Sequence, residues 1–356
     1  MDRQALGTAS IIRANSRDLP LADNSVDLVV TSPPYFALRS YQDGGEHYAG
    51  QIGDEPTPDE FVSSLLEVTR ECMRVLKSSG SLWVNLGDKY AGRSGGPQGA
   101  TGDRATRIQA GTYAGSRPNV SALVRDKSLI GVPWRYALRC IDDLGLILRA
   151  EVIWSKPNGL PESVTDRVRR SHETWFHFTL APRYFSAVDE IREAHVEGQR
   201  PGVLTWEQRR ARGDKAARYS DQNGHGGTAG MAQSPLGKLP GSVWTVPTEP
   251  LRVPDHLDID HFAAFPTQWP LRIIKAWCPE GGTVLDPFGG TGTTAMVAKA
   301  LGRHGISVDM SADYCRLAEW RTNDRDQLPK VLGVAKVEQQ PEDQLSMFDL
   351  LDWEAS

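Results

Sequence analysis

The sequence is poor in cysteine, has no long apolar run and carries little net charge. Its four cysteines form no Cys-x-x-Cys pair, and none lies at metal-ligand spacing from a histidine, so neither a disulfide scaffold nor a metal site is expected. No apolar stretch approaches the ~20 residues that span a membrane. The first ten residues lack a signal-peptide core. We therefore expect a cytoplasmic protein with reduced cysteines.

The net charge of −5 over 356 residues does not by itself indicate a nucleic-acid-binding protein. The acidic residues are unevenly distributed, however. The last twenty residues contain no Lys or Arg but hold Glu338, Glu342, Asp343, Asp349, Asp352 and Glu354. Without this segment the chain is nearly neutral, and residues 331–356 are expected to form an acidic flexible tail.

Segments of strand and helix type alternate along the first half of the chain. Residues 25–30 form a β-branched apolar run typical of a buried parallel strand. Residues 57–80 show apolar positions at helical spacing, with Thr57 suited to the N-cap, Pro58 to the first turn and Gly80 to the end. The same reasoning predicts a strand over 81–86, a helix over 133–145 and an edge pair of strands over 146–157 and 173–182. This alternation predicts a mostly parallel α/β sheet.

A glycine-rich turn lies between two further predicted strands, 283–286 and 304–309. The clustered glycines followed by a helix are typical of nucleotide-binding turns, and Asp309 follows at the separation needed to bind a ribose diol. A turn without a ligand remains an alternative, and the glycine spacing also fits dinucleotide binding. Asp286 argues against a dinucleotide, because a carboxylate at this position would repel a pyrophosphate. It favours a cationic ligand such as the ammonium group of S-adenosylmethionine (AdoMet).

The sequence TSPPY, residues 31–35, directly follows the first predicted strand. The two prolines have fixed φ, so the Pro33 carbonyl is held in one direction, and Pro34 places no N–H beside it. Ligands of parallel α/β sheets bind at the carboxyl edge, where this motif would lie. Ser32 adds a hydroxyl group and Tyr35 adds a flat aromatic face.

These groups suit an exocyclic amine on a planar ring, whose lone pair is normally delocalised into the ring. The Ser32 oxygen and the Pro33 carbonyl would accept its two hydrogens and localise the lone pair, while Tyr35 stacks on the ring. The amine would then attack an electrophilic methyl group directly. Ser32 is too weak a base to deprotonate the amine first, so proton loss is expected to follow methyl transfer.

TSPPY and DPFGGTGTT (residues 286–294) together resemble the catalytic and AdoMet-binding motifs of the DNA amino-methyltransferases, which form N4-methylcytosine or N6-methyladenine. The catalytic motif comes first, as in the β group of that family, and the likeness covers most of residues 10–322. The resemblance implies a Rossmann-like AdoMet-dependent fold, with helices on both faces of a mostly parallel twisted sheet and a circularly permuted motif order. It also implies a target base flipped out of duplex DNA.

The resemblance also implies roles for individual residues. The catalytic residues would be Ser32, Pro33, Pro34 and Tyr35. The cofactor would lie against Asp286, Pro287, Phe288, Gly290, Gly292, Thr293, Asp309, Phe265, Pro266, Asn15 and Thr31. Asn15 stands where the family often has an acid near the adenine of AdoMet, which leaves the role of that position open.

Two long segments, 91–129 and 187–240, interrupt the pattern with Gly, Arg and polar residues. We expect residues 1–184 to form the catalytic half with a mobile loop over 91–129, and residues 246–330 to form the AdoMet-binding half. Residues 185–245 would be an inserted target-recognition region that contacts DNA through Arg209, Arg210, Arg212 and Arg218. A solvated loop of mixed charge is the alternative for this region.

Ser32 favours cytosine N4 over adenine N6, because cytosine members of the family often carry Ser before the prolines and adenine members more often carry Asp or Asn. An RNA substrate, or a DNA-binding module with a decayed site, are the alternative functions. The intact set of site residues argues against the decayed site. The sequence indicates neither the recognition sequence, nor a partner restriction enzyme, nor the oligomeric state.

The tail contains QLSMFDLL, residues 344–351, which resembles the short peptide by which bacterial proteins dock on the DNA sliding clamp. Gln344, Leu345, Met347 and Phe348 match that peptide in type. An amphipathic turn that packs on the protein's own surface is the alternative. The sequence therefore suggests the clamp as a second partner beside duplex DNA.

Overall fold

The computed structural model describes residues 6–36, 42–43, 46–47, 50–91, 124–159, 161–194, 236–251, 253–254, 257, 259, 264–324 and 331. The four arginines predicted to contact DNA and the clamp-type peptide of the tail lie outside these residues, as does most of the loop predicted over 91–129.

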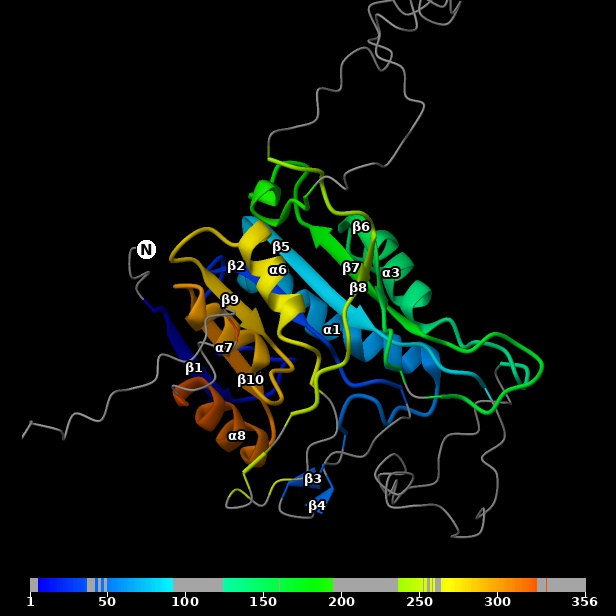
Figure 1. The fold of residues 1–356 in the computed structure, drawn as a ribbon. Coiled ribbons are helices and arrows are strands. Elements are labelled where there is room, and N and C mark those ends of the chain that lie inside the picture. The colour runs from blue at the N-terminus through cyan, green and yellow to red at the C-terminus, as the bar shows by residue number, and fades with distance from the viewer. Residues whose placement is uncertain are drawn as a thin grey trace, which may run out of the picture.

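An eight-stranded sheet forms the centre of the molecule, in the order β1-β10-β9-β2-β5-β7-β6-β8 (Figure 1). Neighbouring strands are parallel except at β7, which is antiparallel to both β5 and β6. The strands are β1 (Thr8–Arg13), β2 (Val26–Thr31), β5 (Leu76–Leu86), β6 (Ile147–Ser155), β7 (His172–Thr179), β8 (Val243–Thr245), β9 (Thr283–Asp286) and β10 (His304–Asp309). A separate hairpin pairs β3 (Gln42–Asp43) with β4 (Glu46–His47).

Helices cover both faces of this sheet, as Figure 1 shows. One face carries α1 (Pro58–Val75) and α3 (Val132–Asp142), which contact each other. The other carries α6 (Gln268–Trp277), α7 (Thr293–Ala300) and α8 (Ala312–Asn323), with the short 3₁₀ helix η2 (Val188–Ile191) beside α6. The predicted α/β class, the mostly parallel sheet and the helices on both faces are confirmed.

The central strands are buried on both sides, as the continuous apolar run of β2 predicted. Val26 and Val29 belong to the core under α1 and α3, whereas Leu28 and Val30 belong to the core under α6 and α7. The second core is rich in buried indole rings, contributed by Trp83, Trp154, Trp175, Trp244, Trp269 and Trp277. Successive rings of this group stack or pack edge to face at centroid distances of 4.6–6.2 Å.

The helix predicted over 57–80 begins as expected but ends early, so its predicted C-terminus was wrong. Thr57 caps α1 by accepting a hydrogen bond from the backbone N–H of Glu60, but the helix stops at Val75 and β5 begins at Leu76. Lys77 explains the change, because its ammonium binds both Asp27 oxygens at 2.8 and 2.9 Å and holds the chain against β2. This local tertiary contact outweighs the helix propensity of the segment.

Two strands of the sheet were absent from the prediction. β1 is only partly buried, and β8 has three residues and lies within the segment expected to be an insertion. Neither shows the apolar run that marked β2. No helix in the described part of the chain is long and apolar enough to cross a membrane.

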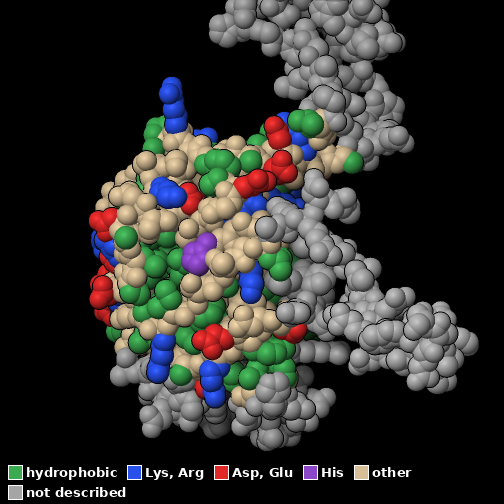
Figure 2. Space-filling view, turned by 90° about the vertical axis from the view of Figure 1, so that its left-hand side faces the viewer, with side chains coloured by type: hydrophobic (Ala, Val, Ile, Leu, Met, Phe, Trp, Pro, Cys, Tyr) green, Lys and Arg blue, Asp and Glu red, His purple; other side chains and the backbone are tan. Residues whose placement is uncertain are grey.

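The face of the molecule beside β1 carries acidic, basic and apolar side chains interspersed with one another (Figure 2). On the described residues of this view the basic side chains form no continuous patch. Ligands of such sheets bind at the carboxyl ends of the parallel strands.

Candidate active site

The glycine-rich turn lies at the carboxyl end of β9 and leads directly into α7. Gly290 and Gly292 have φ of 48° and 72°, a region that favours glycine. A Cβ on Gly292 would also lie 2.7 Å from the Cβ of Ala318 in α8. The backbone N–H of Gly289 donates to the Val308 carbonyl at 2.8 Å and ties the turn to β10. The predicted strand, turn, helix and strand are all present in this order.

Asp286 lies beneath this turn rather than in it, with 1% of its surface exposed. One carboxylate oxygen accepts hydrogen bonds from the Thr31 hydroxyl at 2.6 Å and the Phe288 N–H at 3.1 Å. The other accepts from the Thr294 hydroxyl at 2.9 Å. Burial raises the pKa of Asp286 to about 6, although these three donors act in the opposite direction. The carboxylate therefore links Thr31 of the TSPPY motif to Thr294 of the glycine-rich segment. Its charge lies beneath the turn and can act on a ligand bound above it.

Asp309 occupies the end of β10 beside the turn. Its carboxylate accepts hydrogen bonds from the Gly290 N–H at 3.0 Å and from the Ser311 N–H at 2.8 Å. Both contacts orient the side chain toward the space above the turn. Arg321 of α8 braces the turn from inside, because its buried guanidinium donates to Thr291 and Thr293 hydroxyls at 2.6 and 2.7 Å.

A cavity of about 330 Å³ opens above the turn and reaches the TSPPY motif. Its volume is in the range of small-molecule sites. Of the residues predicted from sequence, its lining includes Asn15, Ser32, Pro34, Pro287, Phe288, Gly290 and Asp309. The sequence reasoning missed Ser16, Arg17, Gly50, Gln51, Ile52, Thr291, Met310, Ser311 and Tyr314, which complete the lining. The structure thus brings the two halves of the predicted site around one space.

Other predicted residues do not line the cavity. Thr31, Asp286 and Thr293 are buried beneath it, as the contacts above show. Phe265 packs edge to face on Trp175 in the core under α6 and α7, with ring centroids 5.7 Å apart. Pro266 accepts a hydrogen bond from the Trp269 N–H at the start of α6. Neither of the last two residues lines the cavity, and their roles stay predictions.

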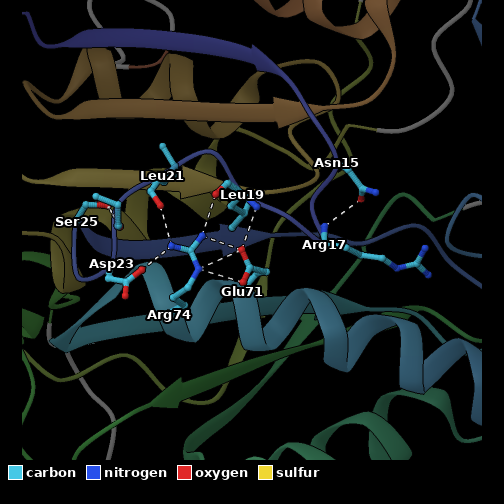
Figure 3. A network of polar contacts seen from close by, with 9 residues as sticks. Asn15, Arg17, Leu19, Leu21, Asp23, Ser25, Glu71 and Arg74 are labelled. Carbon is cyan, nitrogen blue, oxygen red and sulfur yellow. Dashed lines mark hydrogen bonds and ion pairs between the residues drawn. The ribbon is translucent and has the colours of Figure 1, made fainter.

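One wall of the cavity belongs to the loop after β1, which Arg74 of α1 anchors (Figure 3). Its guanidinium donates to the carbonyls of Leu19 and Leu21 at 2.9 and 2.8 Å and pairs with Asp23 and Glu71. The hydrogen bond from Arg74 lowers the pKa of the Glu71 carboxyl. This network holds the loop that carries the cavity residues Asn15, Ser16 and Arg17.

The TSPPY motif is positioned by residues distant in sequence. The hydroxyl of Ser32 donates to the Asn85 side-chain oxygen at 3.2 Å, and the Tyr35 hydroxyl lies 2.8 Å from the same oxygen. A Cβ on Gly87 would lie 2.6 Å from the Tyr35 ring, so glycine at this position allows the ring its place. Within the described residues no hydrogen bond to the Pro33 carbonyl is found, which leaves that acceptor available.

Asn85 was missed although the sequence contained a signal for it. It is a polar residue inside the apolar strand β5 and only 1% of its surface is exposed. A buried amide requires hydrogen-bond partners, and such a residue near the carboxyl end of a central strand is therefore a candidate for the site. Its own N–H₂ group donates to the Thr174 carbonyl at 3.3 Å.

Comparison with known proteins shows the family of the chain. A family model described as DNA methylase, of the N6 and N4 methyltransferases, matches residues 26–320. The Type II methyltransferase M.SmaI of Serratia marcescens is 35% identical over 83% of this chain and 83% of its own length. The Type II methyltransferase M.Cfr9I of Citrobacter freundii is 32% identical over 86% and 84%, respectively.

Solved structures show the same fold. The PvuII DNA methyltransferase, described as cytosine-N4-specific, is 19% identical, with a TM-score of 0.58 over 93% of this chain and 95% of its own. The protein TTHA0409 of Thermus thermophilus, complexed with S-adenosyl-L-methionine, is 20% identical, with a TM-score of 0.50 over 92% and 94%. On the family match and the identities to its relatives, the chain belongs to the DNA methylases of the N6 and N4 amino-methyltransferase family.

Proposed function

We propose that this DNA methyltransferase transfers the methyl group of AdoMet to the N4 amine of a cytosine flipped out of duplex DNA. Methyl transfer to DNA and the use of AdoMet follow from the family. The choice of base is the proposal, and Ser32 is the observation that carries it, because the cytosine members that the motif resembles often have Ser at this position.

The cavity fits AdoMet in size and in charge. Asp309 presents a carboxylate suited to the ribose hydroxyls, and the backbone at Gly290 allows close approach to the ligand. Asp286 places negative charge beneath the turn, which favours a cationic ligand. When bound, AdoMet supplies an electrophilic methyl group, and the cavity reaches Ser32 and Pro34 of the catalytic motif.

The geometry of Ser32 and Pro33 suits the holding of an exocyclic amine. Because Ser32 donates its proton to Asn85, its oxygen lone pairs can accept one hydrogen of the amine. The Pro33 carbonyl can accept the other. These two acceptors localise the nitrogen lone pair toward the methyl group, and Tyr35 offers its ring face to the flipped base. The proton is lost after transfer because neither acceptor is a strong base.

The test is the identity of the product. The enzyme is expressed in a host lacking other amino-methyltransferases, the DNA is digested to nucleosides, and methylated nucleosides are separated by mass spectrometry. N4-methylcytosine is expected with the wild type and not with Ser32→Ala. N6-methyladenine alone would overturn the choice of cytosine, and labelling of a matched RNA in preference to duplex DNA would overturn DNA as the substrate.

The arginines of residues 185–245 remain the proposed recognition surface. Their position between the two halves of the site and their density support this role. We expect joint Ala replacement of Arg209, Arg210 and Arg212, or replacement of Arg218, to weaken DNA binding in a gel-shift titration while AdoMet binding is unchanged. Unchanged DNA affinity would contradict the assignment.

The proposed clamp contact rests on the composition of Gln344, Leu345, Met347 and Phe348 at the end of an acidic segment. In a pull-down with purified sliding clamp, the full chain should be retained and a chain ending at Gln340 should not. Equal retention of both chains would refute the contact.

A further inference from the structure

Glu173 contacts the catalytic motif from β7, two strands away from β2 in the sheet. Its carboxylate lies 2.7 Å from the Tyr35 hydroxyl, across 138 residues of sequence. It is the second residue of β7, where it pairs with Trp154 of the antiparallel strand β6. Only 16% of its side chain is exposed. The carboxylate therefore reaches the motif from a rigid strand pair and is largely removed from water.

Tyr35 has one phenolic proton, and among the residues that the structure describes its hydroxyl lies within hydrogen-bond distance of Glu173 at 2.7 Å and Asn85 at 2.8 Å. A hydrogen bond to an ionised carboxylate is roughly twice as strong as one to a neutral amide. The proton therefore goes to Glu173. The Asn85 oxygen has two lone pairs, and it accepts from the Ser32 hydroxyl at 3.2 Å.

Lys156 holds the carboxylate of Glu173 in place. Its ammonium contacts the second Glu173 oxygen, and its side chain is 19% exposed. The same ammonium lies over the Trp154 ring, 4.0 Å from the centroid. The ion pair holds the Glu173 carboxylate in place, and the Trp154 ring of β6 in turn holds the lysine.

We propose that Glu173 is a positioning residue of the methyl-transfer reaction. It accepts the phenolic proton of Tyr35 and thereby fixes the plane of the ring on which the flipped base lies. This role rests on the proposed function of the TSPPY motif, and it holds for either target base.

A double-mutant cycle of Glu173→Gln and Tyr35→Phe tests this assignment. The substrate is plasmid DNA carrying the site found by sequencing the methylated host genome, with tritiated AdoMet as donor. Glu173→Gln should lower kcat about tenfold, as expected for a charge-assisted hydrogen bond. S-adenosylhomocysteine affinity and the thermal midpoint should stay close to wild type. In the Tyr35→Phe background, Glu173→Gln should cost less than about twofold, because its partner atom is absent.

Glu162→Gln is the matched control, since Glu162 lies in the connection that leads from β6 to β7 and likewise pairs with a cation, Arg167, at 2.7 Å. It should leave kcat unchanged. An equal loss from Glu173→Gln in the wild-type and Tyr35→Phe backgrounds would overturn the proposal and assign Glu173 a structural role through Lys156. Unchanged kcat in the single variant would overturn it as well. A wild-type enzyme that labels no DNA would instead refute the proposed function itself.

Discussion

The buried carboxylate of Asp286 should make the stability of the ligand-free protein depend on pH in a direction unusual for an acid. Its pKa is raised by burial from 3.8 to about 6. The folded state therefore favours the protonated form. The resulting stabilisation is fully present below pH 3.8 and is lost as the pH rises through about 6. The difference corresponds to about 3 kcal/mol of unfolding free energy.

Asp286→Asn is a well-matched perturbation. The asparagine oxygen can keep the bonds from Thr31 and Phe288, and its amide can donate to Thr294, whose hydroxyl can turn to the Val30 carbonyl 3.3 Å away. Urea unfolding of both proteins between pH 3 and 8 measures the effect. The free energy of wild type minus that of the variant should fall by about 3 kcal/mol as the pH rises through 6.

Taking this difference removes the contribution of groups that titrate equally in both proteins. AdoMet binding supplies a second measurement. Wild-type affinity should decline below pH about 6, as Asp286 gains a proton and no longer attracts a cation, whereas the affinity of Asp286→Asn should be flat in that range. The same pH slope in both proteins, in unfolding or in binding, would refute the assignment of the raised pKa to Asp286.

Three further predictions concern other parts of the fold. Gly292→Ala should destabilise the protein by more than about 2 kcal/mol in urea unfolding, because Gly292 has a φ of 72° and an added Cβ would contact Ala318. The control Gly281→Ala, where an added Cβ meets no atom within 4 Å, should cost about 1 kcal/mol. Arg74→Ala should weaken AdoMet binding measured by calorimetry without altering the product, and unchanged affinity would contradict the role of the anchored loop. Burial lowers the pKa of His177 from 6.5 to about 3, so its NMR signals should show a neutral ring at pH 5, and titration above that pH would contradict its buried environment.

The sequence predicted the elements whose signals are local. The apolar run of β2 and the strand, turn and helix around Gly290 were placed correctly because burial on both faces and positive φ restrict the amino acids at those positions. The helix end after Val75 was not, because it depends on Lys77 and Asp27, which meet only in the folded chain. Partly buried β1 and the three residues of β8 carry too little pattern to be recognised.

The site divides in the same way. Ser32 and Asp309 were found because each belongs to a short motif with its own chemistry, and both line the cavity. Asp286 was also found, but its depth beneath the turn was not, since its partner Thr31 lies 255 residues away in sequence. Glu173 carries no motif signal at all. Its relation to Tyr35 is created by the antiparallel strand pair.

The strand order has a consequence for the way the protein folds. β1 and β2 are close together in sequence, yet β9 and β10 lie between them in the sheet. During synthesis the place between β1 and β2 therefore stays unfilled until β9 and β10 have been made. These strands and α8, which ends at Asn323, are the last elements of the domain. Such non-local pairing slows folding and exposes unpaired strand edges. Insertion of β9 and β10 closes the sheet and, in the same step, brings Asp286 to Thr31, so methylation competence should appear only when the last strands have been released from the ribosome.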